Sequence, residues 1–307
     1  MKNLPDQLTG LAGYPFERNY YVRPDGLALQ YVDEGKGPAV VMAHGNPTWS
    51  FFFRNMINDL SSDHRCLVPD HMGMGLSSRP TAEEYGFRLE DRVADMEALM
   101  DHWNIDGPVH FVVHDWGGPI ALSWAAAHPE RVASVTIMNS GTRIPDGYHL
   151  PVKLGLFKYA GPLGQYLAKD LGLFVNGTAV FGASTPLSRE AKDGLTAPYR
   201  TPESRLGIAR FVADIPLDPI HPSYACLGRI DRNVGTALAN KPISLVWGLE
   251  DFVFTRTVYL DWRKRFPQAE GLVLPEAGHY LLEDDPQRVC SFVRKFIVKS
   301  ENNERSE

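Results

Sequence analysis

Hydrophobic and polar positions alternate along the chain in a pattern that predicts strands separated by helices. Short, mostly apolar runs occur at residues 39–44, 65–70, 109–113, 133–139, 242–248 and 271–279, as expected for strands covered on both faces. Residues 17–34 form two strand-like stretches around a Pro-Asp-Gly turn, which predicts a β-hairpin. From Leu89 to Trp103, apolar residues recur at helical spacing. The alternation predicts an α/β protein with a mostly parallel sheet and helices on both faces.

The alternation stops between residues 142 and 235, which contain no clear buried strand. This segment has helical stretches broken by proline and glycine, and it is rich in Leu, Phe and Tyr. We therefore predict a core made of residues 1–141 and 236–307, with a helical cap (142–235) inserted in it. A final amphipathic helix is expected from about Pro286 to Ile297. Because parallel sheets bind ligands at the carboxyl ends of their strands, the cap is expected to lie over that site.

The composition of the 307 residues is typical of a soluble globular protein, with 44% hydrophobic and 22% charged residues. A formal net charge of −6 argues against a nucleic-acid partner. No run approaches the roughly 18 apolar residues of a membrane span, and the N-terminal residues do not resemble a signal peptide. Cys66, Cys226 and Cys290 match no metal-binding spacing. We expect a cytoplasmic protein that uses no metal and no organic cofactor.

A polar residue, Asp115, lies between the apolar run VHFVV (109–113) and a helical pattern that begins with Gly117 and Gly118. A strand joined to a helix through such a tight turn is typical of a nucleophile elbow, which lifts one side chain above the end of a sheet. An Asp at this point can also act simply as the N-cap of the helix. The segment by itself leaves both interpretations open.

Two further polar residues follow later strands: Asp251 in WGLEDF and His279 in PEAGHY. The chain order of nucleophile, acid and base is that of the α/β-hydrolase catalytic triad. Each residue alone has an ordinary structural explanation, but three in this order at strand ends favour a triad. Glu250 is the adjacent alternative for the acid.

An aspartate nucleophile restricts the chemistry, because a carboxylate is ionised at neutral pH and can attack carbon without a base. His279 would then activate water or move a proton, with Asp251 orienting its ring. Asn46 and Trp116 are candidate donors to the leaving group through their side chains, and to an oxyanion through their backbone N–H groups. An Asn-Pro turn and core packing are the alternatives for these two. Apolar residues are expected to line the pocket: Trp49, Phe51 to Phe53 and those of the cap.

Several motifs resemble the haloalkane dehalogenase branch of the α/β-hydrolase superfamily: HGNPTWSFFFR (44–54), DHMGMGLS (70–77), VVHDWGGPIAL (112–122), WGLEDFVF (247–254) and AGHYLLED (277–284). The resemblance implies an α/β-hydrolase fold with a mostly parallel eight-stranded sheet. It implies Asp115 as nucleophile, His279 as base and Asp251 as acid. It also implies Asn46 and Trp116 as the two residues that stabilise the leaving group.

The chain is also similar to the cis-β-lactone decarboxylases of bacterial long-chain olefin biosynthesis, through YPF (14–16), YVDEG (31–35) and ARFVADIPLDPIHPSYA (209–225). This resemblance implies a hydrophobic lactone with two long alkyl chains, converted to a cis-alkene, and allows a complex with other enzymes of that pathway. Haloalkane hydrolysis is the alternative. Less favoured are an epoxide hydrolase, for which the cap supplies four tyrosines, and a non-enzymatic ligand receptor. The tyrosines are Tyr159, Tyr166, Tyr199 and Tyr224.

Overall fold

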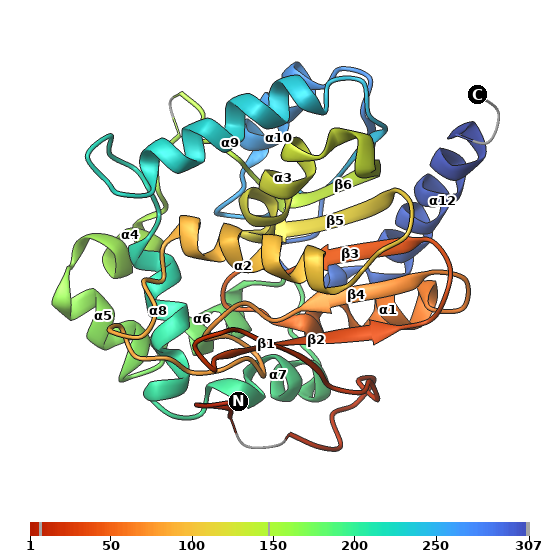
Figure 1. The fold of residues 1–307 in the computed structure, drawn as a ribbon. Helices are drawn as coiled ribbons and strands as arrows, with labels where there is room; N and C mark the ends of the chain where they lie inside the picture. The colour runs from red at the N-terminus through yellow and green to blue at the C-terminus, as the bar shows by residue number, and fades with distance from the viewer. Residues whose placement is uncertain (6–7, 147, 305–307) are drawn as a thin grey trace.

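The structure, a computed structural model, describes residues 1–5, 8–146 and 148–304. Within these residues eight strands form one sheet. Figure 1 shows β1 to β6 of this sheet side by side near its centre. The strands are β1 (Asn19–Val22), β2 (Ala28–Glu34), β3 (Ala39–Ala43), β4 (Arg65–Pro69), β5 (Val109–Asp115), β6 (Val132–Ser140), β7 (Ile243–Gly248) and β8 (Glu270–Leu274). The predicted hairpin corresponds to β1 and β2.

The order of the strands across the sheet is β1-β2-β4-β3-β5-β6-β7-β8. Pairs β1/β2 and β2/β4 are antiparallel, and every other neighbouring pair is parallel. The chain runs outward from β3 to β4 and then returns to add β5 on the other side of β3. Ligands of open parallel sheets bind at such a reversal, so the crevice between the carboxyl ends of β3 and β5 is the place for a site.

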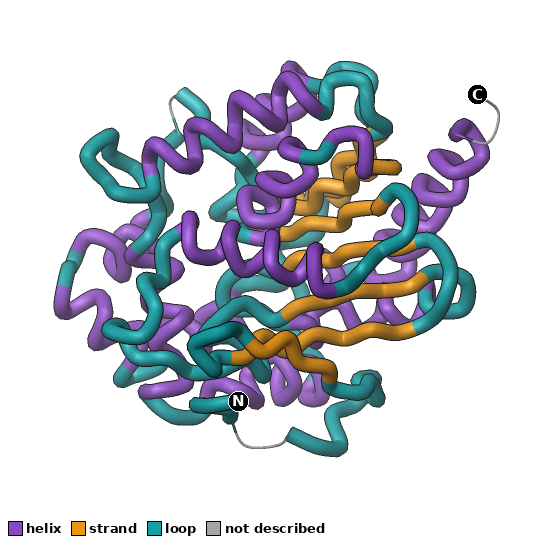
Figure 2. Tube along the Cα trace, in the orientation of Figure 1, coloured by secondary structure: helices purple, strands orange, loops and turns teal. Residues whose placement is uncertain are grey.

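Helices cover both faces of the sheet, and the strands form a single layer between them (Figure 2). On one face, α3 packs against both α2 and α9, while α12 packs with α1 and β6. The helices that flank the strands include two short 3-10 helices, η1 and η2. Their bounds are η1 (Ser50–Phe53), α1 (Arg54–Leu60), α2 (Leu89–His102), α3 (Gly117–Ala127), η2 (Pro129–Arg131), α9 (Tyr224–Ala237), α10 (Arg256–Arg265), α11 (Leu281–Asp284) and α12 (Pro286–Glu304).

The segment predicted as a cap is helical and lies at the left in Figure 1, beyond the carboxyl ends of the parallel strands. Its elements are α4 (Val152–Tyr159), α5 (Pro162–Lys169), α6 (Leu173–Phe181), α7 (Arg189–Thr196), η3 (Ala197–Tyr199), η4 (Glu203–Arg205) and α8 (Leu206–Ala213). Helix α9 crosses the predicted boundary at residue 235 and packs against α3 on the sheet. This packing favours a cap that ends before Tyr224, and the domain boundaries stay a proposal.

The apolar pattern of the sequence did not predict the full length of the last helix, and it did not predict helix α10. The last helix runs to Glu304. The apolar spacing predicted its end near Ile297, because the final turns of this helix are polar. Helix α10 carries only two buried residues, Val258 and Trp262, so its sequence has a weak apolar face. No helix in residues 1–5, 8–146 and 148–304 is both long and apolar enough to cross a membrane.

Candidate active site

Asp115 lies at the turn between β5 and α3 with a φ of 50° and is buried. A positive φ is uncommon for a residue with a side chain, and it turns the carboxylate away from the strand direction. The turn is tight because α3 starts directly over β3: a Cβ at Gly117 would lie 2.0 Å from the carbonyl oxygen of Ala43. The Ser140 hydroxyl donates to the Asp115 carbonyl oxygen at 2.6 Å and ties the turn to β6.

The Asp115 carboxylate accepts two backbone hydrogen bonds. The N–H of Asn46 donates to Oδ1 at 2.6 Å, and the N–H of Trp116 donates as well. Burial raises the pKa of the Asp115 carboxyl, while His279 and these two donors oppose that shift. The backbone groups expected to form an oxyanion hole therefore hold the Asp115 carboxylate itself.

His279 and Asp251 form a buried pair, in which the Nδ1–H of His279 donates to Asp251 Oδ2 at 2.8 Å. Burial acts to lower the pKa of His279, but the carboxylates of Asp251 and Asp115 outweigh it and the net pKa is raised. Burial acts to raise the pKa of Asp251, but His279 and hydrogen bonds outweigh it and the net pKa is lowered. Because the Nδ1–H of His279 donates to Asp251, the Nε2 atom of His279 is left for proton exchange. Glu250, the alternative acid, is exposed.

Asn139 is a member of this group whose role the sequence did not reveal. Its side-chain N–H donates to Asp251 Oδ2 at 2.7 Å, and its Oδ1 accepts from the Gly248 N–H at 2.8 Å. It has a positive φ of 35° and lies where the pairing of β5 with β6 shifts register. A bulge of this kind re-aims a side chain, and here it directs the amide toward Asp251. The sequence signal that could have identified Asn139 was its position as a polar residue near the end of β6.

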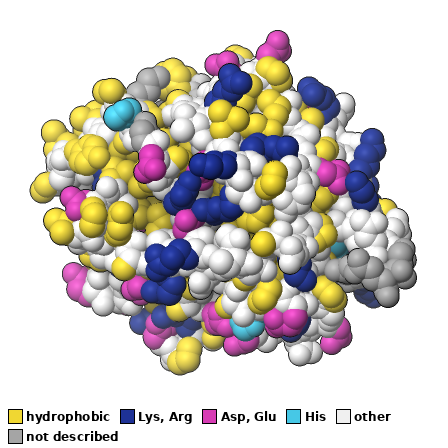
Figure 3. Space-filling view, turned by 90° about the horizontal axis from the view of Figure 1, so that it is seen from above, with side chains coloured by type: hydrophobic (Ala, Val, Ile, Leu, Met, Phe, Trp, Pro, Cys, Tyr) yellow, Lys and Arg dark blue, Asp and Glu magenta, His cyan; other side chains and the backbone are white. Residues whose placement is uncertain are grey.

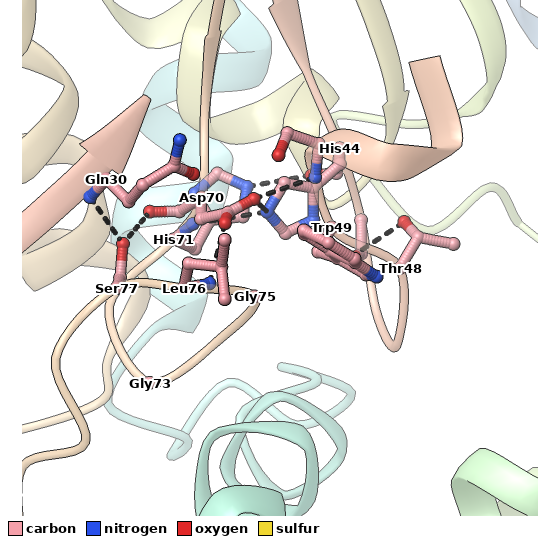
Figure 4. Close-up of polar contacts among 12 residues, drawn as sticks. Gln30, His44, Thr48, Trp49, Asp70, His71, Gly73, Gly75, Leu76 and Ser77 are labelled. Atoms are coloured by element: carbon pink, nitrogen blue, oxygen red, sulfur yellow. Dashed lines mark hydrogen bonds and ion pairs between the residues drawn. The ribbon is translucent and has the colours of Figure 1, made fainter. Parts of the chain in front are cut away.

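The loop that carries Asn46 is anchored to the loop after β4, as Figure 4 shows. Its neighbour His44 accepts a hydrogen bond from the His71 N–H through Nε2 at 3.1 Å, and the His71 ring donates to the His44 carbonyl at 2.7 Å. Asp70 accepts from the N–H groups of Ser50 and Leu76, each at 2.7 Å. These buried contacts fix the Asn46 N–H that faces Asp115.

A cavity of about 370 Å³ begins at Asp115 and extends under the cap. Asn46, Trp116 and His279 line its inner end. The Asn46 amide donates to the Ile208 carbonyl at 3.2 Å, whereas the indole N–H of Trp116 has no hydrogen-bond partner in the part of the chain that the structure describes. Most of the wall is apolar and comes from the cap and from the segment after β7, and includes Leu150, Leu154, Phe157, Leu173, Phe174, Val253 and Phe254.

The prediction that Trp49 and Phe51 to Phe53 line the pocket is wrong. All four side chains are fully buried in the core and none borders the cavity. The Trp49 indole donates to the Gly194 carbonyl at 3.0 Å, and the Phe51 ring lies where a Cβ at Gly194 would be. The aromatic segment therefore packs beneath α7. Phe254, which the sequence analysis did not select, stacks on the His279 ring at 5.9 Å between centroids.

The four cap tyrosines lie away from the cavity wall. Tyr159, Tyr166 and Tyr224 are exposed, and Tyr199 is buried with its hydroxyl bonded to Thr48 and Gly75. Tyr148 does border the cavity, but its hydroxyl donates to the Val253 carbonyl at 2.9 Å. These positions offer little support for an epoxide hydrolase that opens its substrate with a pair of tyrosines.

Comparisons with known proteins agree with this architecture. Residues 38–286 match the family described as alpha/beta hydrolase fold. A cis-3-alkyl-4-alkyloxetan-2-one decarboxylase of Shewanella oneidensis is 37% identical over 94% of this chain and 90% of the relative. The protein of the same name from Xanthomonas campestris is 34% identical over 94% of this chain and 98% of its own length.

Haloalkane dehalogenases are similar as well. Haloalkane dehalogenase 2 of Mycobacterium bovis is 31% identical over 91% of this chain and 94% of its own length. A crystal structure of the haloalkane dehalogenase of Bradyrhizobium elkani superposes with a TM-score of 0.82 at 25% identity, covering 94% of this chain and 99% of that one. The resemblance stated from the motifs is confirmed. With its sheet order and the match over residues 38–286, the chain belongs to the alpha/beta hydrolase fold family.

Proposed function

We propose that this protein is an aspartate-nucleophile enzyme that decarboxylates cis-3-alkyl-4-alkyl β-lactones to cis-alkenes. One observation carries the proposal: the Asp115 carboxylate lies at the inner end of an apolar cavity that it shares with His279. The two relatives with 37% and 34% identity bear the decarboxylase name, which supports a lactone as the substrate. The apolar wall suits a hydrophobic small molecule with alkyl chains.

The proposed reaction starts with attack of an Asp115 oxygen, not on the carbonyl carbon, but on the alkyl-bearing ring carbon that is bonded to the ring oxygen. The bond between these two ring atoms breaks, and the freed carboxylate leaves as carbon dioxide. The electron pair of the C–C bond that joined this carboxylate to the ring forms the C=C bond and expels Asp115 as a carboxylate. Atoms therefore balance, and no water enters the reaction. The Trp116 indole N–H and the His279 ring, when it is protonated, are the donors available to the negative charge that develops.

Attack at the carbonyl carbon is the competing route, and it leaves an acyl group on Asp115 that water must remove. Isotopic oxygen tests the proposed route, because water oxygen enters Asp115 only when water attacks the carboxyl carbon of an Asp115 adduct. After many turnovers in ¹⁸O-labelled water, peptide mass spectrometry should find Asp115 unlabelled if it is expelled intact. Label in Asp115 would show that water attacks an adduct of that residue and would contradict the proposed route.

Haloalkane hydrolysis is the second candidate, because the indole N–H of Trp116 lies at the cavity wall, has no hydrogen-bond partner among the described residues, and suits a halide. The reaction would form an alkyl ester of Asp115, which water activated by His279 would hydrolyse. The 31% identical haloalkane dehalogenase supports this alternative. A cytoplasmic location and association with olefin-pathway enzymes remain predictions.

The test compares two substrates with one enzyme and one variant. We expect the wild type to form an alkene from a dialkyl β-lactone, and Asp115→Asn to form none. The variant should fold, because an amide oxygen can accept from the same two backbone donors. Halide release from a 1-bromoalkane without alkene from the lactone would favour the second candidate. Full activity of Asp115→Asn on both substrates would refute both.

A further inference from the structure

Large apolar side chains are exposed mainly on the cap. In Figure 3 they gather at the left, the side on which α4 and α5 lie in Figure 1. Outside α4 to α8, the described residues with such exposure are scattered: Met1, Leu4, Val22, Ile220, Tyr224, Leu260 and Val298. We call the exposed set on α4 to α6 and their connections the apolar cap face: Val152, Leu156, Tyr159, Leu163, Tyr166, Leu171, Leu173, Val180 and Phe181.

The apolar cap face follows helical spacing. Val152, Leu156 and Tyr159 are separated by four and three residues along α4 and therefore lie on one side of that helix. Val152 is 90% exposed and Tyr159 69% exposed, while Leu154 on the inner side is buried. Helix α4 is thus apolar on both sides, although a helix with one side in water ordinarily carries polar residues there.

The exposed surface is continuous with the cavity. Leu156 and Leu173 are 52% and 47% exposed, and both also line the cavity that ends at Asp115. Apolar side chains therefore extend from the outer surface of the cap to the wall of the cavity that contains Asp115. A cap that served only to exclude water would not need this exposed extension of the cavity wall.

The charges of this region fit an anionic lipid surface. Residues 148–183 contain three lysines and one acid, Asp170, in a chain whose formal net charge is −6. The side chain of Asp170 pairs with Lys169 at 3.3 Å. The acidic excess of the chain therefore lies elsewhere, and little negative charge on the apolar cap face opposes lipid phosphates.

We propose that the apolar cap face docks on a phospholipid bilayer and that the substrate enters the cavity directly from the lipid. The identity of that substrate rests on the proposed function; the docking does not. Because the described helices cannot cross a membrane, the contact would be peripheral, with apolar side chains at the level of the headgroups. A dialkyl substrate dissolved in lipid would reach Asp115 without crossing water.

The test is flotation of the full-length protein with vesicles of phosphatidylglycerol and phosphatidylcholine. Val152→Glu/Leu163→Glu places two charges on the apolar cap face at residues that do not line the cavity. Leu260→Glu, at an exposed leucine on α10, is the matched control. We expect the wild type and the control to float, and the double variant to bind at least about tenfold more weakly. Its activity on a short, water-soluble substrate should be unchanged.

Failure of the wild type to bind vesicles, or equal binding by the double variant, would overturn the proposal. So would a wild type that stays unbound but forms an oligomer that the double variant abolishes, because the face would then bind protein. Vesicle binding as expected without alkene formation would leave the docking intact and refute the decarboxylase function.

Discussion

Gly45 occupies a position where one methyl group would displace the proposed nucleophile. A Cβ built on Gly45 lies 2.0 Å from Asp115 Oδ1 and 2.2 Å from its Cβ. Ordinary contact between such atoms begins at about 3.5 Å, so in Gly45→Ala the Asp115 carboxylate must move by more than about 1 Å. The φ of Gly45 is not in the positive region, so alanine can adopt its backbone and the effect is steric.

A shift of this size should cost activity more than stability. A misplacement of about 1 Å at a reacting atom can lower the rate about 100-fold. Overpacking of a buried site costs about 1–3 kcal/mol, which the fold is expected to survive. We therefore expect Gly45→Ala to retain a cooperative thermal transition and to lose about 100-fold in first-turnover rate.

The assay is rapid-quench measurement of the first turnover, with Tm measured by circular dichroism. Gly228→Ala on α9 is the control, because a Cβ there meets only the end of the Arg232 side chain at 3.5 Å. The control should keep its rate and be as stable as the wild type or more so. A Gly45→Ala enzyme as fast as the wild type would refute the idea that the close backbone positions Asp115.

Three further predictions concern the residues around Asp115. For a reaction in which His279 acts as base, Asp251→Asn should lower turnover about 10⁴-fold. The same change should move the acid limb of the pH–rate profile for haloalkane hydrolysis to lower pH, because the carboxylate that raises the pKa of His279 is lost. An unchanged acid limb would contradict the pairing of Asp251 with His279. The folded pKa of His279 lies above its ordinary value of 6.5, so its stabilising contribution is present below that pH and lost as pH rises through the folded pKa. The Tm difference between the wild type and His279→Gln should narrow over that range, and a difference that widens would reverse the assigned shift. Trp116→Phe keeps a ring against Phe211, 5.4 Å away, and removes an N–H with no partner among the described residues. It should therefore lower turnover about 10²–10³-fold with little change in Tm, and equal loss of both would indicate a packing role.

The sequence alone predicted most of the core, since buried parallel strands are short apolar runs and their helices have a marked period. Helix α10 was missed, because an apolar face of two residues is too weak a pattern. The triad residues could be proposed from chain order because each follows a strand. The sequence favoured Asp251 as the acid and kept the adjacent Glu250 as the alternative, since the two side chains have the same chemical type and differ in direction. The structure exposes Glu250 and buries Asp251, and it therefore favours Asp251 as the acid.

The chemistry available to the proposed nucleophile follows from residue type, so the sequence by itself was enough to propose a carboxylate, Asp115, that attacks carbon. Tertiary structure decided which side chains meet that carboxylate. Trp49, Phe51 and Phe254 are all aromatic residues within the quoted motifs. The tertiary structure placed Trp49 and Phe51 in the core and Phe254 against His279. It also aimed Asn139 at Asp251 through a register shift between β5 and β6. Local patterns reveal periodicity and residue chemistry, whereas such contacts depend on strand pairing and helix packing between segments far apart in the chain.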